Sequence, residues 1–295
     1  VLMIWRNKRK RYNFTLETAQ GGSGIVPFRY TDLQHATKNF TEKLGEGSFG
    51  SVFKGVLSDS TTIAVKGLML HIKERNNSGC SRSDSKLLVY EYMPHRSLDI
   101  DLLLGTITLG IARGLAYFHE SCRECIIHCD VKPQNILLDK SFISKIADFG
   151  MAKFLGREFS RALTTIRGTI GYLAPEWISG GAITPNYSYG MLLLEIVSGR
   201  KNSHRECTTT GGDDTYFPVQ VASKLLVGDI GSLVDDKLHG DVHLNEACKV
   251  ACWCIQDNEP NLPTMGEVVQ VLEGLIELDI PPMPRLLQAI GGSHS

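Results

Sequence analysis

The chain has 295 residues, of which 42% are hydrophobic, and its formal net charge is −1. This length is enough for one large domain or two lobes with a sizeable core, and the composition is that of an ordinary soluble fold. The near-neutral charge excludes a strongly basic protein that binds nucleic acid through its overall charge. The sequence also shows no internal repeat, no low-complexity tract and no nucleic-acid-binding module.

The N-terminal residues combine a short apolar run with a cluster of positive charge. Residues 1–5 are apolar, and five of the next six residues are Arg or Lys. Five apolar residues cannot cross a bilayer, which takes about 20 residues. An apolar end followed by basic residues is typical of the cytoplasmic edge of a membrane span. We therefore predict that residues 1–11 are the end of a span, which lies upstream of or ends at residue 5, plus a basic juxtamembrane run; a solvated basic tail is the alternative.

Residues 12–43 are expected to form a juxtamembrane linker. The run Gly21-Gly22-Ser23-Gly24 lies at the centre of a flexible stretch. A short helix through Ala36 is predicted near the end of the linker, with Thr31 or Asp32 as its N-cap.

A glycine-rich hairpin is predicted over residues 44–52. Its three glycines, Gly45, Gly47 and Gly50, allow the backbone to approach phosphate groups closely. Two further strands are expected, one over Ile63-Ala64-Val65-Lys66 and one over residues 87–92. Because strands rather than a helix surround the glycines, the pattern does not fit a dinucleotide-binding fold.

The connection between the last two strands is short and polar. Only 25 positions separate Lys66 from Glu91, and Glu74 is the only glutamate between them. Residues 75–85 are loop-like in composition. We expect the strand over residues 87–92 to be left at the edge of its sheet, where unpaired backbone groups are an aggregation hazard.

A helix is predicted over residues 106–121. Ile107, Ile111, Leu115 and Phe118 recur at helical spacing and indicate one buried face. The helix is expected to end just before residues 126–150 and to support them from below.

Residues 126–150 contain the groups that phosphoryl transfer needs. That reaction uses metal ions to neutralise phosphates, a carboxylate to orient the attacking hydroxyl, and positive charge on the transferring phosphate. Asp130, Lys132 and Asn135 lie on one short loop, and Asp148 follows in an Asp-Phe-Gly triplet. Between them two apolar runs surround a polar turn at residues 139–141, which predicts a hairpin that brings Asp148 back beside Asp130.

The cysteines are predicted to be reduced thiols. Cys122, Cys125 and Cys129 lie upstream of or inside the loop that carries Asp130, where a disulfide would strain it. A zinc site at Cys122-x-x-Cys125 is disfavoured because no second pair with matching spacing follows. The cysteines at positions 248, 252 and 254 lie in an apolar helical stretch and are assigned to the core.

These motifs resemble those of protein kinases. The resemblance rests on the glycine-rich hairpin followed by Lys66, on His128-Cys129-Asp130 with Asn135, and on the Asp-Phe-Gly triplet. Residues 168–176, Gly-Thr-Ile-Gly-Tyr-Leu-Ala-Pro-Glu, resemble the peptide-docking segment of serine/threonine kinases. Residues 251–257 and 281–287 are similar to those of plant receptor-like kinases of the S-domain lectin type.

The resemblance implies an α+β, two-lobed kinase fold with a small, shortened strand-rich lobe and a large helical lobe. It implies Asp130 as the catalytic base, Lys132 as the phosphate cation, and Asn135 with Asp148 as Mg²⁺ ligands. The implied ATP-binding residues lie on the glycine-rich hairpin, the following strand and the segment after residue 90: Leu44, Gly45, Gly47, Gly50, Val52, Ala64, Lys66, Glu91 and Met93.

Three positions depart from the family pattern. Cys129 stands where most kinases carry an arginine, so a phosphate on the activation segment lacks its usual cationic partner. Pro185-Asn186 replace an aspartate that supports the catalytic loop in the family. Leu262 replaces the arginine that pairs with the glutamate corresponding to Glu176.

The sequence therefore predicts the cytoplasmic part of a plant receptor-like kinase at the plasma membrane, with a kinase domain at residues 44–278 and a tail at residues 279–295. Its expected activity is ATP-dependent phosphorylation of serine or threonine on a protein substrate, with Mg²⁺ as cofactor. An alternative from another class is a degenerate kinase that serves as a binding or scaffold module. Residues 67–85 discriminate between the two, because an enzyme needs Lys66 held on the phosphates and a scaffold does not.

Overall fold

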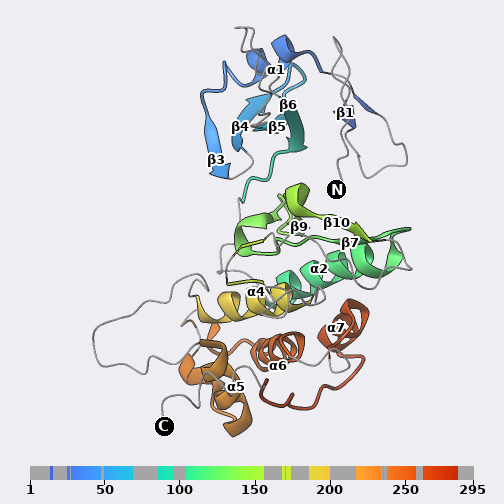
Figure 1. Ribbon diagram of the computed structural model, residues 1–295. Coiled ribbons are helices and arrows are strands. Elements are labelled where there is room, and N and C mark those ends of the chain that lie inside the picture. The colour runs from blue at the N-terminus through green and yellow to red at the C-terminus, as the bar shows by residue number, and fades with distance from the viewer. Residues whose placement is uncertain are drawn as a thin grey trace, which may run out of the picture. The chain divides into compact units, whose positions relative to one another are not determined.

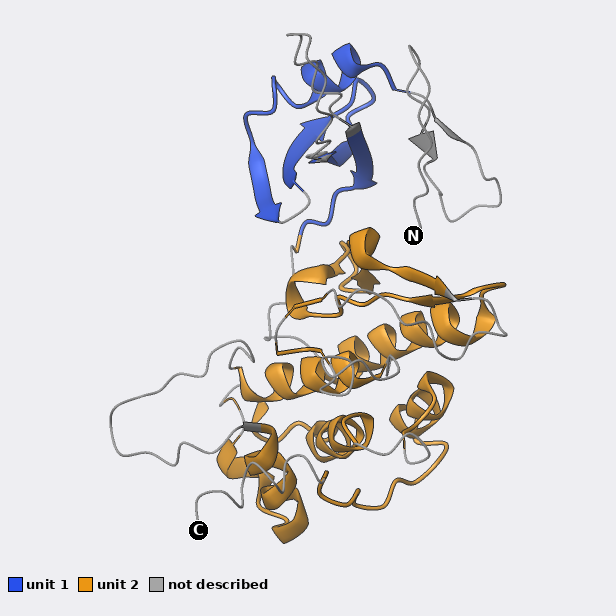
Figure 2. Ribbon diagram, in the orientation of Figure 1, with its two compact units in different colours: residues 1–94 blue, residues 95–295 orange. Residues whose placement is uncertain are grey.

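The computed structural model describes residues 14–15, 25–26, 28–47, 50–68, 86–95, 104–155, 168–169, 171–173, 186–199, 217–233, 235, 238–256 and 262–284. The predicted membrane-proximal residues 1–11, Glu74, Glu176 and Pro185 lie outside these ranges. The chain divides into two compact units, residues 1–94 and residues 95–295 (Figure 2).

The first unit is built on a four-stranded antiparallel sheet (Figure 1). Its strands, in the order β3-β4-β5-β6, are Lys43–Gly47, Gly50–Val56, Thr62–Leu68 and Lys86–Glu91. The first two form the predicted glycine-rich hairpin, in which Gly47 lies opposite Gly50. Within the described residues β6 pairs only with β5, so the expected position at the sheet edge is confirmed. A short separate pair, β1 (Phe14–Thr15) and β2 (Ile25–Val26), precedes the sheet.

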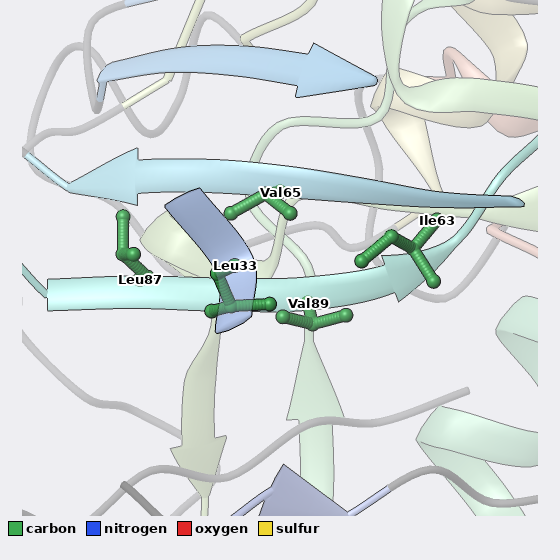
Figure 3. Close-up of a cluster of buried hydrophobic side chains, with 5 residues drawn as sticks. All are labelled: Leu33, Ile63, Val65, Leu87 and Val89. Atoms are coloured by element: carbon green, nitrogen blue, oxygen red, sulfur yellow. The ribbon is translucent and has the colours of Figure 1, made fainter. Parts of the chain in front are cut away.

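Helix α1 (Tyr30–Ala36) contributes to the core of this unit. Its Leu33 is 1% exposed and lies in a cluster with four side chains of β5 and β6, as Figure 3 shows: Ile63, Val65, Leu87 and Val89. The predicted cap at Thr31 or Asp32 is wrong. The helix begins two or three residues earlier, after Arg29, because the Asp32 carboxylate reaches back to accept the Arg29 backbone N–H at 3.3 Å.

The second unit is largely helical (Figure 1). Helix α2 (Leu104–Ala116) buries Ile107, Ile111 and Leu115, as their spacing predicted, and a π-helical turn, Tyr117–Ser121, extends it. Helix α4 (Tyr187–Ser198) is buried on nearly every side and ends at Gly199, whose φ of 65° is left-handed. It packs against α6 (Leu244–Cys254), in which all three cysteines are buried as predicted.

Two further helices complete this unit. Helix α5 (Phe217–Val227) packs against α6, and α7 (Met265–Leu272) packs against α2. Specific contacts fix both ends of α7. Thr264 and Glu267 cap each other's backbone N–H groups at its start. The helix ends at Leu272 because Gly274 has a left-handed φ of 71°, and its N–H bonds back to Val271 O.

Short strands and 3₁₀ turns lie between α2 and α4. Strand β7 (Cys125–Ile127) pairs with β10 (Lys153–Leu155), and β8 (Ile136–Leu138) pairs with β9 (Ser144–Ile146), which confirms the predicted hairpin. The 3₁₀ turns in this region cover Pro133–Asn135 and Phe149–Met151, and a further one, Ile230–Leu233, follows α5. No helix in the described part of the chain is both long enough and apolar enough to cross a bilayer.

Candidate active site

The carboxylate of Asp130 lies at the centre of the candidate site in the second unit. Asp130 is 3% exposed and accepts hydrogen bonds from three side chains. Oδ2 accepts a hydrogen bond from the amide nitrogen of Asn135 at 2.9 Å and lies 2.9 Å from Lys132 Nζ. Oδ1 accepts a hydrogen bond from the hydroxyl of Thr169 at 2.6 Å. These contacts leave the carboxylate little freedom to rotate.

Lys132 and Thr169 also contact each other. Lys132 Nζ donates to Thr169 Oγ1 at 2.8 Å, so the ammonium, the hydroxyl and the Asp130 carboxylate form a closed triangle. Charge-assisted hydrogen bonds of this kind are shorter and stronger than neutral ones. The sequence marked Thr169 as part of a docking segment and as a hydroxyl that could be phosphorylated, and its role in this triangle was missed.

Close backbone contact brings Thr169 to the loop. A Cβ atom at Gly168 would lie 3.0 Å from the carbonyl oxygen of Cys129 and 2.4 Å from the Leu173 side chain. The φ of Gly168 is 152°, a value that other residues rarely adopt. A glycine is therefore required next to Thr169. Glycine followed by threonine is the only sequence signal that could have indicated this contact.

Asn135 and Asp148 are joined through the backbone of Ala147. The Ala147 N–H donates to the Asn135 carbonyl at 2.8 Å, and the Ala147 carbonyl lies 2.9 Å from His128 Nε2. Asp148 then takes a left-handed conformation, with φ 62° and ψ 65°. The hairpin thus fixes the backbone at Asp148 next to the loop that carries Asn135.

His128 is a buried neutral histidine. Burial lowers its pKa, and the partly opposing effects of the Ala147 carbonyl and of nearby carboxylates are smaller. Its partners define one tautomer, because Nε2–H donates to the Ala147 carbonyl and Nδ1 accepts the Asp130 N–H at 3.3 Å. The ring of Phe149 packs edge-on against it, with centroids 4.7 Å apart. His128 therefore supports the loop rather than exchanging protons.

Cys129 occupies the position where the family pattern has an arginine. Its backbone is left-handed, with φ 62°, and its side chain is buried. Burial raises the pKa of the Cys129 thiol to about 11, so the thiol is protonated at neutral pH and is a poor nucleophile. This position supplies no positive charge to a phosphorylated activation segment.

The residues present fit a magnesium ion. Both side-chain hydrogen bonds of Asn135 are made by its amide nitrogen, which leaves the amide oxygen available as a ligand. Mg²⁺ prefers oxygen ligands and is usually held by only one or two carboxylates. Asn135 and Asp148 supply one amide oxygen and one carboxylate, which matches this preference. The described residues contain no group of three or more His, Cys, Asp or Glu that could hold a metal.

The candidate nucleotide residues share one face of the sheet in the first unit. Lys66 of β5 lies opposite Val52 of β4 and Leu88 of β6, and Ala64 lies opposite Tyr90. Residues directly opposite on antiparallel strands point to the same face, which here is the face turned away from Leu33. Lys66 is 8% exposed.

The remaining candidate nucleotide residues lie at the two ends of this sheet. Leu44, Gly45 and Gly47 lie on β3, and Gly50 begins β4. Glu91 is the exposed last residue of β6, and Met93 follows it, partly buried. The hairpin and the strand end are thus both part of the unit that carries Lys66.

The sequence did not predict a buried hydrogen bond between Tyr172 and Glu195. The Tyr172 hydroxyl donates to the Glu195 carboxylate, which α4 carries into the core. Burial, reinforced by that carboxylate, raises the pKa of Tyr172. The segment containing Thr169 is therefore fixed to α4 only three residues further on. Asn186, at the start of α4, donates instead to the Pro263 carbonyl.

Comparison with known proteins identifies the family. Residues 75–271, about two thirds of the chain, match the family model described as protein kinase domain. A G-type lectin S-receptor-like serine/threonine-protein kinase of Arabidopsis thaliana is 50% identical over 92% of this chain and 37% of its own length. A second one, SD2-2, is 42% identical over the whole chain and 42% of its own length. A probable receptor-like protein kinase of the same plant is 35% identical over 94% of this chain and 72% of its own length.

The chain is shorter than the regions it matches. It spans about two fifths of the first two relatives. The match to SD2-2 extends over 344 positions although this chain has 295 residues, so at least 49 of those positions have no residue here. The similarity nevertheless covers most of the chain, and the sheet followed by a helical unit is the arrangement of a kinase fold. The chain therefore belongs to the protein kinase family, among relatives that are plant receptor-like serine/threonine kinases.

Proposed function

We propose that this chain transfers the γ-phosphoryl group of ATP to serine or threonine hydroxyls of protein substrates. The observation that carries the proposal is the buried Asp130 carboxylate, held by Asn135, Lys132 and Thr169 within 2.6 to 2.9 Å. Phosphoryl transfer needs positioning and charge rather than covalent chemistry, and this arrangement supplies both.

Each residue of the loop has a distinct role in this proposal. Asp130 accepts the hydrogen bond of the substrate hydroxyl and orients it for attack. Lys132 Nζ lies 2.9 Å from Asp130 Oδ2. A phosphoryl group in transfer to a hydroxyl held by Asp130 would therefore be close to the positive charge of Lys132. Thr169 holds the carboxylate from its other oxygen. A serine or threonine hydroxyl is the expected acceptor because the docking segment has the Gly-Thr pattern of that class.

Asn135 and Asp148 would hold Mg²⁺. When bound, the ion neutralises charge on the phosphates of ATP. Both ligands are oriented by the protein itself. Asp130 holds the Asn135 amide nitrogen, and the hydrogen bonds of Ala147 hold the backbone next to Asp148.

The face of the sheet with Lys66 would bind the nucleotide. Gly45, Gly47 and Gly50 would approach its phosphates, and Leu44, Val52 and Ala64 would cover its base. The backbone of Glu91 and Met93 would hydrogen-bond the adenine. What supports these roles is the register that brings Val52, Ala64 and Lys66 to one face.

A second candidate function is that of a binding module with weak catalysis. The observation that favours it is the connection between β5 and β6, which runs from Leu68 to Lys86 and leaves few residues for the helix that carries the lysine's glutamate partner in the family. The two candidates predict different turnovers. An autophosphorylation rate at least about a hundredfold below that of an intact relative supports the weak enzyme, and a relative-like rate excludes the scaffold.

We also propose that the protein is held at the plasma membrane with this unit on the cytoplasmic side. The basic run within residues 6–11 and the receptor-like relatives support the proposal. A fluorescent fusion of the complete encoded protein tests it, because a uniformly cytosolic signal contradicts membrane anchoring.

The test of the catalytic proposal is Asp130→Asn. We expect the substitution to lower transfer of labelled γ-phosphate by about a hundredfold or more while the Kd for Mg·ATP changes less than twofold, because the carboxylate orients the hydroxyl and does not hold the nucleotide. Asp229→Asn is the matched control, since Asp229 is exposed on the same unit. Retained transfer in the Asp130 variant removes this residue from the proposed role.

A further inference from the structure

His95 forms an aromatic contact that no part of the proposed mechanism uses. Its ring stacks on that of Phe142, with centroids 4.0 Å apart and an interplanar angle of 26°. Both residues belong to the second unit, and His95 is the first residue of that unit. The chain thus makes a specific contact at the point where it leaves the segment with Glu91 and Met93.

Phe142 is held in an unfavourable backbone conformation. Its φ is 59°, which is uncommon for any residue with a side chain and costly for an aromatic one. The turn that imposes it is well braced. Asp139 Oδ1 accepts the N–H groups of Ser141 at 2.8 Å and Ile143 at 3.0 Å, and the Phe142 N–H donates to the Asp139 carbonyl at 2.9 Å.

The position of this turn relates the strained residue Phe142 to the proposed magnesium site. Strain that a fold keeps in place often accompanies a functional contact. The turn is the tip of the β8–β9 hairpin, which starts directly after Asn135 and ends two residues before Asp148. Phe142 therefore lies at the tip of the hairpin that joins the two proposed magnesium ligands.

We propose that His95 and Phe142 are a positioning pair, which anchors the chain leaving the adenine-binding segment to the hairpin that carries Asn135 and Asp148. The inference rests on the proposed ATP-dependent function. The stack restrains His95, and only Tyr92, Met93 and Pro94 separate it from Glu91, the last residue of β6. A segment this short that is restrained at its His95 end has fewer conformations to lose when a nucleotide binds.

The first experiment measures nucleotide affinity by titration with a fluorescent ATP analogue in the presence of Mg²⁺. We expect His95→Ala and Phe142→Ala each to raise the Kd about three- to tenfold. The double variant should be no weaker than either single one, because each substitution already removes the stack. Phe142→Tyr keeps a ring and should bind as the natural chain does. Ile143→Ala is the matched control, since Ile143 is 52% exposed at the same hairpin tip and takes no part in the stack.

The second experiment measures hydrogen–deuterium exchange at the backbone amides of Tyr92, Met93 and His95 without nucleotide. Both alanine variants should accelerate exchange there about tenfold and leave exchange in α6 unchanged. Unchanged exchange at residues 92–95 overturns the positioning pair, as does independent addition of the two effects on Kd. If the natural chain binds no nucleotide but exchange still accelerates, the anchor stands and the proposed ATP-dependent function fails.

Discussion

The hydroxyl of Thr169 donates a 2.6 Å hydrogen bond to Oδ1 of Asp130 from a segment 39 residues further along the chain. Because Lys132 and Asn135 contact the other oxygen, both carboxylate oxygens are held by side chains. A substrate hydroxyl would therefore meet a carboxylate whose orientation is set before the substrate arrives.

Thr169 is predicted to matter for transfer rather than for nucleotide binding. Thr169→Ala removes the hydroxyl and should lower the transfer rate about tenfold, since one hydrogen bond to a charged group contributes roughly 1.5 kcal/mol or more. Thr169→Ser keeps the hydroxyl and should retain most of the activity. Steady-state kinetics with a peptide substrate measure both, and Thr106→Ala, an exposed substitution on α2, is the control. Equal rates for the Thr169→Ala and natural chains would contradict the prediction.

Asp148 is predicted to carry most of the magnesium affinity, since it is an ionised ligand and Asn135 a neutral one. Asp148→Ala should weaken Mg·ATP binding tenfold or more and reduce the dependence of ATP affinity on Mg²⁺ concentration. Isothermal titration at several Mg²⁺ concentrations measures this effect. Asp229→Ala removes an exposed carboxylate of the same unit and serves as the control. Identical titrations for the Asp148 variant and the natural chain would count against the assignment of the metal site.

Leu33→Ala is predicted to destabilise the first unit by about 2–5 kcal/mol, the usual cost of emptying a fully buried leucine site. Leu33 is 1% exposed in the cluster with Val65 and Val89. Urea unfolding, monitored by a spectroscopic probe in the first unit, measures the loss in the free energy of unfolding. Val56→Ala, at a β4 position that is 49% exposed, should change the free energy of unfolding by less than about 1 kcal/mol. A Leu33 variant as stable as the natural chain would show that α1 is not part of this core.

Stability is predicted to fall as the pH is lowered from 7 to 5. Burial lowers the pKa of His119 to about 4, whereas an unfolded histidine has a pKa near 6.5. Below pH 6.5 the unfolded chain therefore binds a proton that the folded chain does not, which favours unfolding.

The contribution of His119 to this loss is about 1–2 kcal/mol at pH 5. Chemical denaturation at pH 7 and pH 5 measures it. His119→Gln removes the titrating group and should make the free energy of unfolding less dependent on pH across this window. The same pH dependence in both proteins would rule out His119 as its source.

Much of the candidate site could be predicted because its parts are close in sequence. Asp130 and Asn135 are five positions apart on one loop, and a polar turn between two apolar runs was sufficient to predict the β8–β9 hairpin. In these cases local geometry fixes which residues meet.

The contacts that sequence did not reveal join distant segments. Thr169 meets Asp130 across 39 residues, and Tyr172 meets Glu195 across 23 residues, and neither has a local pattern that selects its partner. The start of α1 was missed for a different reason. Arg29 is a poor capping residue by type, and the Asp32 side chain compensates for it from inside the helix.

In the proposed membrane-anchored protein, the packing of α1 would also limit how far the kinase unit extends from the bilayer. Residues 28–43 lead from α1 into the sheet of the first unit, so they are not available as free tether. Sixteen extended residues would span at most roughly 53–58 Å. A kinase unit held at a bilayer through the residues before 28 would therefore sweep a smaller volume, and substrates in the same membrane would come within reach more often than substrates deep in the cytosol.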